Sequence, residues 1–247
     1  MNKLNITWCW PDVLNLHGDR GNVMALERIG KKMGLSVEVH KTTNFGDSLD
    51  FKQTDVLLLN PGEFKSNEYI VNAFRNVKDQ LDAYIEEGGV ILTVGTTGAA
   101  FGKTIRRLDG STISGLGYLD MECAERDNIV GDDLITRMRG TDFELNGSQI
   151  QVMDTTLSSD VALSDVEYGY GNNGYEEKHE GARYKNLIFT NMLGPVLVKN
   201  PWLAQHLIQK AMERKGVSIP ELPVETFELE RKSLECIRKY NRTKADK

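Results

Sequence analysis

The chain has 247 residues, 40% of them hydrophobic and 27% charged, which suits one large α/β domain or two small ones and argues against bulk disorder. A net charge of −6 argues against a protein that binds nucleic acid, because such proteins usually carry excess positive charge. Three widely spaced cysteines exclude a disulfide framework and a Cys-x-x-Cys metal site. We therefore expect no metal and no other cofactor.

No apolar run approaches the roughly 20 residues that a membrane-spanning helix needs. The N-terminus also lacks the basic segment followed by a long apolar segment that is typical of a secretory signal. We therefore expect a cytoplasmic protein without a membrane span.

Hydrophobic periodicity up to residue 104 predicts alternating strands and helices. That alternation favours a mostly parallel sheet with right-handed crossovers. Helical spacing predicts a helix over 19–33 and a single long helix that begins after Ser66 as its N-cap and ends at Gly88. The expected strands are 3–9, 35–40, 55–60 and 90–94.

The middle of the chain, 112–190, is less regular, with strand-like runs at 148–153 and 186–192. Asn200 followed by Pro201 predicts the start of another helix, because proline suits the first helical position.

That helix is expected to end at Gly216, with a linker over 217–223 and a last helical stretch over 224–241. The predicted organisation is one domain, 1–216, and a C-terminal linker with a basic helical tail, 217–247. Residues 231–247 carry seven Lys/Arg against two acidic residues, a charge of +5 that leaves −11 for the rest. Two hypotheses stay open: a solvated tail, or a docking element for an acidic partner.

A glycine-rich turn, 95–102, follows the expected strand 90–94, and α/β folds place functional groups at such turns. A phosphate-binding loop would need glycine at Thr97, five residues before Gly102. A nucleophile elbow would suit residue 95, but Gly95 has no side chain. The third interpretation is a tight connection without chemistry.

Six blocks of the sequence stand out, in chain order: LNLHGDRGNVMAL (14–26), GLGYLD (115–120), GD (131–132), YGYGNN (168–173), EGARYKN (180–186) and GPVLVKNP (194–201). Together and in this order, the blocks resemble the class I glutamine amidotransferases of the cobyric acid synthase type, and among them the GatD glutaminase subunits of lipid II isoglutaminyl synthase. The resemblance implies a flavodoxin-like α/β fold with a mostly parallel sheet flanked by helices.

The residues that frame this resemblance, such as Asp19 and the pair Asn172 and Asn173, have two interpretations. They either determine the fold, with Asp19 capping a helix and the asparagines in left-handed backbone, or they form a surface for a partner.

The same resemblance implies a Cys–His dyad, and this sequence departs from it at both positions. Gly95 matches the nucleophilic cysteine and Leu193 matches the histidine. The glycine-rich oxyanion segment is matched by Asn60, Pro61 and Gly62, where proline removes a backbone donor. A substrate-binding arginine is matched by Asn128. The predicted degenerate pocket consists of Asn60, Pro61, Gly62, Thr96, Thr97 and Asn128.

The cysteines and histidines lie elsewhere in the sequence: Cys9, Cys123, Cys236, His17, His40, His179 and His206. Glutaminase activity is therefore predicted to be lost. The resemblance to subunits that pair with a MurT ligase further implies that the chain is a partner or regulator of a MurT-like ligase in peptidoglycan (lipid II) amidation. The alternative is an enzyme with a repurposed pocket, in which Thr96, Thr97, Asp19 or Glu63 hydrolyses or binds a different small molecule.

Overall fold

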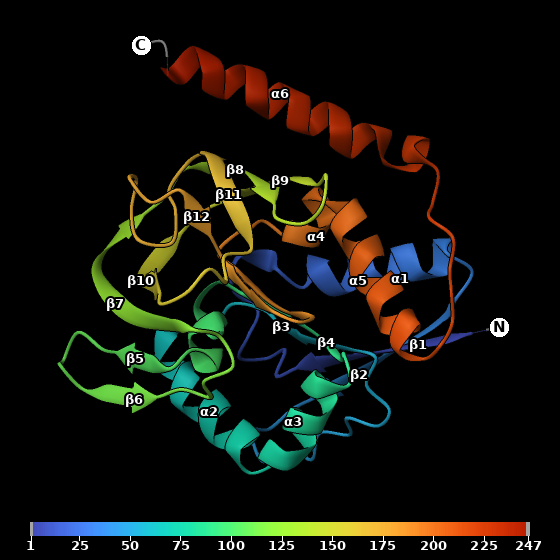
Figure 1. Cartoon of the computed structure of the whole chain (residues 1–247), viewed down its shortest axis with the longest axis horizontal. Helices are drawn as coiled ribbons and strands as arrows, with labels where there is room; N and C mark the ends of the chain where they lie inside the picture. The colour runs from blue at the N-terminus through green and yellow to red at the C-terminus, as the bar shows by residue number, and fades with distance from the viewer. Residues whose placement is uncertain (1, 246–247) are drawn as a thin grey trace.

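The predicted parallel strands and one further strand assemble into a six-stranded sheet in the computed structural model, which describes residues 2–245 (Figure 1). The spatial order is β13-β14-β4-β3-β1-β2, with β13 antiparallel to β14 and the other neighbours parallel. The parallel strands thus follow the flavodoxin-like order 2-1-3-4-5, which confirms the predicted fold class. The bounds are β1 Lys3–Cys9, β2 Ser36–Thr42, β3 Val56–Leu59, β4 Val90–Val94, β13 Ala182–Tyr184 and β14 Leu187–Thr190.

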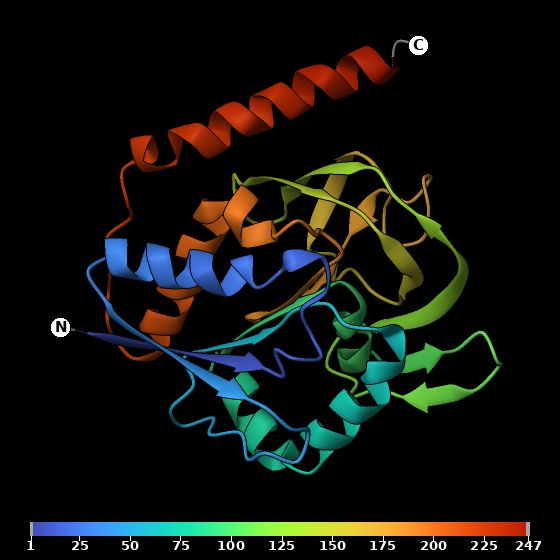
Figure 2. The ribbon, with the colours of Figure 1, turned by 180° about the vertical axis from the view of Figure 1, so that it is seen from behind.

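Helices cover both faces of this sheet (Figure 2). Side chains alternate between the faces along each strand, so Leu58 packs in the core beneath α1 and α5, while Leu57 packs in the core beneath α2 and α3. Helix α5 begins at Pro201 as predicted. The helices are α1 Gly21–Lys32, α2 Asn67–Arg75, α3 Lys78–Glu86, the short α4 Val196–Lys199 and α5 Pro201–Arg214.

The expectation of one long helix from Ser66 to Gly88 is wrong. Val77, with φ −125° and ψ 26°, leaves the helical conformation and separates α2 from α3. Its side chain still packs against the core, so the apolar spacing continues across the break and does not reveal it. Ser66 does occupy the N-cap position of α2, as predicted, but it also ends a preceding 3-10 turn, η2 (Phe64–Ser66), and its side chain makes no capping hydrogen bond.

The irregular middle of the chain folds into two smaller sheets, in the orders β10-β7-β5-β6 and β12-β11-β8-β9. The expected strand 148–153 is divided, because β9 ends at Ser148 and β10 begins at Gln151. The strands are β5 Thr104–Arg106, β6 Thr112–Ser114, β7 Met121–Val130, β8 Asp133–Met138, β9 Glu144–Ser148, β10 Gln151–Leu157, β11 Ser164–Tyr168 and β12 His179–Glu180.

The C-terminal helix α6 (Glu228–Ala245) follows a 3-10 turn, η4 (Val224–Phe227), and lies across the body of the protein (Figure 1). Buried residues recur at intervals of seven along this segment, with Phe227 at the end of η4 and Leu234 and Asn241 on α6.

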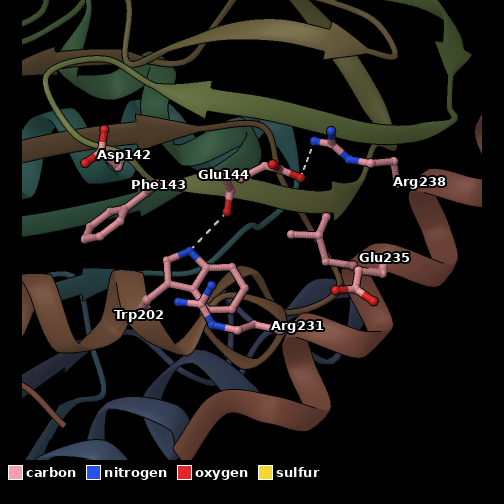
Figure 3. A pocket seen from close by; sticks show the side chains of 8 residues that line it. Asp142, Phe143, Glu144, Trp202, Arg231, Glu235 and Arg238 are labelled. Carbon is pink, nitrogen blue, oxygen red and sulfur yellow. Dashed lines mark hydrogen bonds and ion pairs between the residues drawn. The ribbon is translucent and has the colours of Figure 1, made fainter. Parts of the chain in front are cut away.

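Charged and aromatic contacts accompany this packing around a cavity of about 380 Å³ (Figure 3). Arg238 forms ion pairs with Glu144 and with Glu167, the latter at 2.8 Å. The Arg231 guanidinium lies 5.3 Å from the ring centroid of Trp202. Part of the positive charge of the C-terminal segment is therefore paired within the chain. Asp246 and Lys247 of the same segment lie outside the described residues.

The domain division at 216 stays a prediction.

Within residues 2–245, no helix is both long and apolar enough to cross a membrane.

Replacing Leu234 by Ser should weaken the packing of α6 on the body of the protein. The leucine side chain is only 9% exposed, and serine would lose the apolar contacts that it makes. We expect faster cleavage after Glu221 by a glutamate-specific protease and faster amide exchange in α6. Leu229→Ser is the matched control, since Leu229 on the same helix is 77% exposed. Equal cleavage rates for the two variants would contradict the docked position of α6.

Candidate functional site

Three of the predicted site residues follow neighbouring strands of the parallel sheet, whose carboxyl ends meet at one edge. Pro61 follows β3, Gly95 follows β4 and Leu193 follows β14. A Cβ atom placed on Gly95 would lie 3.1 Å from Cβ of Pro61 and 3.4 Å from Cδ2 of Leu193. The structure therefore brings these three positions together, and the two apolar side chains occupy the space beside residue 95.

The backbone at Gly95 makes a sharp bend between a strand and a helical turn. Val94 is extended, Gly95 has φ +62°, and the 3-10 helix η3 (Gly95–Phe101) begins there. A nucleophile elbow has this strand–turn–helix form, with a strained residue that displays its side chain above the sheet. The bend is present here, but the residue at its apex carries no reactive group.

The end of β3 offers few free donors beside this bend. Pro61 has no backbone N–H. The N–H of Gly62 is directed to Oγ1 of Thr96, at 3.3 Å, and that hydroxyl donates to the Gly62 carbonyl at 2.6 Å. The Gly62 amide is thus already engaged by its neighbour across the site.

Thr97 is buried, and its hydroxyl lies 2.8 Å from the hydroxyl of Thr93 and 3.0 Å from the carbonyl of Val94. Glu63 pairs with Lys65 at 2.5 Å. Within residues 2–245, the hydrogen-bond partners of the Thr96 and Thr97 hydroxyls include no carboxylate. The geometry of a carboxylate-activated threonine is therefore not assembled here.

A buried polar network joins this edge of the sheet to α1. The amide of Asn22 donates to Asp19 at 3.3 Å and to Asn60 at 3.1 Å, and its oxygen accepts the backbone N–H of Leu197 at 2.9 Å. Burial raises the pKa of Asp19 to about 7, against the opposing effect of hydrogen bonds from Asn22 and the Gly194 backbone.

The expectation that Asp19 caps α1 with its side chain is wrong, because Arg20 occupies the N-cap position. The Asp19 carboxylate instead faces inward, where it accepts the hydrogen bonds just described. The sequence block 14–26, which contains Asp19 and Asn22, thus links α1 to α4 and to the end of β3 through hydrogen bonds.

A second buried network centres on Glu180, which is 0% exposed. Its carboxylate accepts hydrogen bonds from the Thr190 hydroxyl at 3.0 Å, the Asn191 backbone at 2.6 Å and the Ser164 hydroxyl at 3.3 Å. Burial raises its pKa to about 7. These bonds fix the segment after β14, two residues before Leu193, to the second of the small sheets.

Asn172 extends this network. Its amide exchanges two hydrogen bonds with the backbone of Gly181, at 2.8 and 2.9 Å, and accepts one from Asn191 at 3.2 Å. The expectation of left-handed backbone at Asn172 and Asn173 is wrong, because neither residue is among those with positive φ. The buried amide, rather than a special backbone conformation, explains asparagine at position 172.

The remaining predicted position lies apart from these networks. Asn128 is exposed on β7, and its side-chain oxygen accepts a hydrogen bond from Arg126 at 3.0 Å. Its partner is thus a neighbour on the same strand rather than a residue of the elbow.

The thiols and imidazoles are dispersed over other elements. Cys9 and Cys123 are buried, and burial raises the pKa of each thiol to about 12, which suppresses the nucleophilic thiolate. Cys236 is exposed on α6. The histidines lie on η1 (Leu16–Gly18), β2, β12 and α5: His17, His40, His179 and His206. Within residues 2–245, no group of three His, Cys, Asp or Glu side chains is arranged to hold a metal ion.

Similarity to curated proteins covers most of the chain. The GatD subunit of lipid II isoglutaminyl synthase (glutamine-hydrolyzing) from Staphylococcus aureus (strain N315) is 33% identical over 221 residues, which are 88% of each chain. The GatD subunit from Streptococcus pneumoniae (strain ATCC BAA-255 / R6) is 30% identical over 227 residues, 90% of this chain and 85% of that one. This chain belongs to the GatD family.

Solved structures agree on the fold. A glutamine amidotransferase crystal structure matches with a TM-score of 0.54 at 14% identity, over 83% of this chain and 98% of that one. PurLQS from Thermotoga maritima matches with a TM-score of 0.57 at 14% identity, over 86% and 99%. This GatD-family chain therefore has a glutamine amidotransferase-type fold. A scan against protein-family models finds no match.

The buried Glu180 predicts a pH dependence of stability. An unfolded glutamate ionises near pH 4.3, so between about pH 4.3 and 7 the folded state holds a proton that the unfolded chain has released. This group therefore makes stability fall as pH rises through that window and level off above pH 7. In Glu180→Gln the slope should shrink, leaving a contribution from Asp19.

Urea unfolding midpoints at pH 5, 6, 7 and 8 measure this slope. Glu176→Gln, at an exposed position in the loop before β12, is the control and should keep the wild-type slope. An unchanged slope in Glu180→Gln would contradict the assigned role of the buried carboxyl.

Proposed function

We propose that this chain is a non-catalytic member of the GatD family that acts as a partner or regulator of a MurT-like ligase in lipid II amidation. One observation carries the proposal. The sharp bend after β4 is present in a GatD-family chain, but Gly95 stands at its apex and Leu193 faces it.

The chemistry of a Cys–His glutaminase supports loss of hydrolysis. A thiolate must attack the glutamine carboxamide, and an imidazole must give a proton to the leaving ammonia. Glycine and leucine supply neither group. The buried thiols of Cys9 and Cys123 cannot substitute, because their raised pKa values keep them protonated.

A role in an assembly is supported by the relatives. Both curated relatives are named as subunits of a glutamine-hydrolyzing synthase, so each functions beside another chain. In the proposal, this chain keeps the fold of such a subunit and contributes binding or regulation rather than ammonia. A pocket repurposed around Thr96 and Thr97 is less favoured, because the partners of both hydroxyls are backbone carbonyls, one backbone amide and Thr93.

Co-expression with a MurT-like ligase tests the proposed partner. We expect a complex that survives size-exclusion chromatography. The control is a Mur-type ligase that works without an amidotransferase subunit, with which we expect no complex. A chain that elutes as a monomer in the presence of the MurT-like ligase would contradict the partnership.

Restoring side chains at the elbow tests the proposed loss of chemistry. The variant Gly95→Cys/Pro61→Gly/Leu193→His removes the proline that lies 3.1 Å from the new Cβ position and places an imidazole opposite the thiol. An adjacent imidazolium lowers a thiol pKa, so we expect alkylation by iodoacetamide at pH 7 to be about 10-fold faster than in the control Gly95→Cys/Pro61→Gly. Equal rates in the two folded variants would mean that Leu193 does not occupy the position of a catalytic histidine.

A further inference from the structure

A second, unrelated feature lies where three elements meet: strand β13, helix α5 and the turn between β8 and β9. They enclose a cavity of about 210 Å³, several times the volume of one water molecule. Four basic side chains line it, and its acidic neighbours lie outside the lining. The basic residues are Arg183, Lys185, His206 and Lys210.

Arg183 is the unpaired charge of this cavity. Other arginines of the body, such as Arg139 and Arg214, form ion pairs with carboxylates at 2.7 and 3.1 Å. Within residues 2–245 the half-buried Arg183 guanidinium has no such partner. It lies against the β8–β9 turn, where a Cβ on Gly140 would be 3.7 Å from its Nη2.

The two lysines lie at the rim and have exposed partners. Lys185 pairs with Glu86 at 2.5 Å, and Lys210 pairs with Glu213 at 2.8 Å. Both glutamates are more than half exposed, so each lysine can turn from its partner to an ion in the cavity at little cost. The neutral polar groups of the lining are already committed, since Thr141 donates to Met138 and Asn186 donates to Gly88.

We propose that this cavity binds a phosphate-class anion, either inorganic phosphate or the phosphoryl group of a larger molecule. A planar guanidinium can donate two parallel hydrogen bonds to a tetrahedral oxyanion, and two flanking ammonium groups favour a dianion over a monovalent ion.

His206 provides an internal reporter of binding. Burial lowers its pKa, Lys210 and Arg183 lower it further, and Glu213 and Glu221 oppose them. An anion held between Arg183 and Lys210 adds negative charge beside the imidazole and should raise that pKa.

Titration calorimetry with potassium phosphate, at constant ionic strength set with KCl, tests the site in the full chain. We expect saturable binding at pH 7 that Arg183→Gln weakens at least about 10-fold and Lys210→Gln weakens less. Arg106→Gln, at an exposed arginine on β5, is the control and should bind as the wild type does. In parallel, the pKa of His206, followed by NMR, should rise with phosphate in the wild type and in Arg106→Gln but not in Arg183→Gln.

A methyl phosphate arm distinguishes the two sources of the ligand. Tighter binding of inorganic phosphate assigns the free ion, and tighter binding of methyl phosphate assigns a phosphoryl group of a larger molecule. Absence of saturable binding below about 10 mM, or equal weakening by Arg106→Gln and Arg183→Gln, would overturn the proposal.

Discussion

The left-handed bend at Gly95 is the constraint on which the site depends. The parallel order of β3, β4 and β14 brings three chain turns to one edge of the sheet, and the bend after β4 aims residue 95 at the other two. Any side chain there would meet Pro61 and Leu193. The bend that could present a nucleophile therefore carries a glycine here, and the apolar side chains of Pro61 and Leu193 occupy the space beside it.

The polar residues that frame this edge act mainly inside the fold. Asn22 joins Asp19, Asn60 and the backbone of α4, while Glu180 joins two sheets at the segment before Leu193. These side chains are buried, so they cannot themselves touch a partner protein. Of the two interpretations of the framing motifs, the fold-determining one accounts for these residues. Removing any one of these side chains would leave its buried partners without a hydrogen bond. An unpaired buried polar group destabilises the folded state by more than a typical hydrogen bond stabilises it.

Much of the main sheet could be predicted from the sequence, because strands buried on both faces read as apolar runs such as VILTV at 90–94. The position of the elbow could be predicted from that strand, the glycine-rich turn after it and the resemblance that matches Gly95 to a nucleophile. The break at Val77 could not, since an apolar residue occupies the expected place on either side of it. The shortest strands of the two small sheets, β5, β6 and β12, could not be predicted either, because each has only two or three residues and so shows no extended alternation. The network around Glu180 and the lone guanidinium of Arg183 depend on contacts between distant segments, which no local pattern encodes.

The most direct measurement of the central claim is ammonia release from glutamine by the purified wild-type chain, alone and with a MurT-like ligase present. We expect a rate equal to that of buffer in both cases, because no thiol or imidazole lies at the elbow. Turnover above that background, if it also fell in Thr96→Ala or Thr97→Ala, would show that other groups at the elbow perform hydrolysis and would contradict a non-catalytic role.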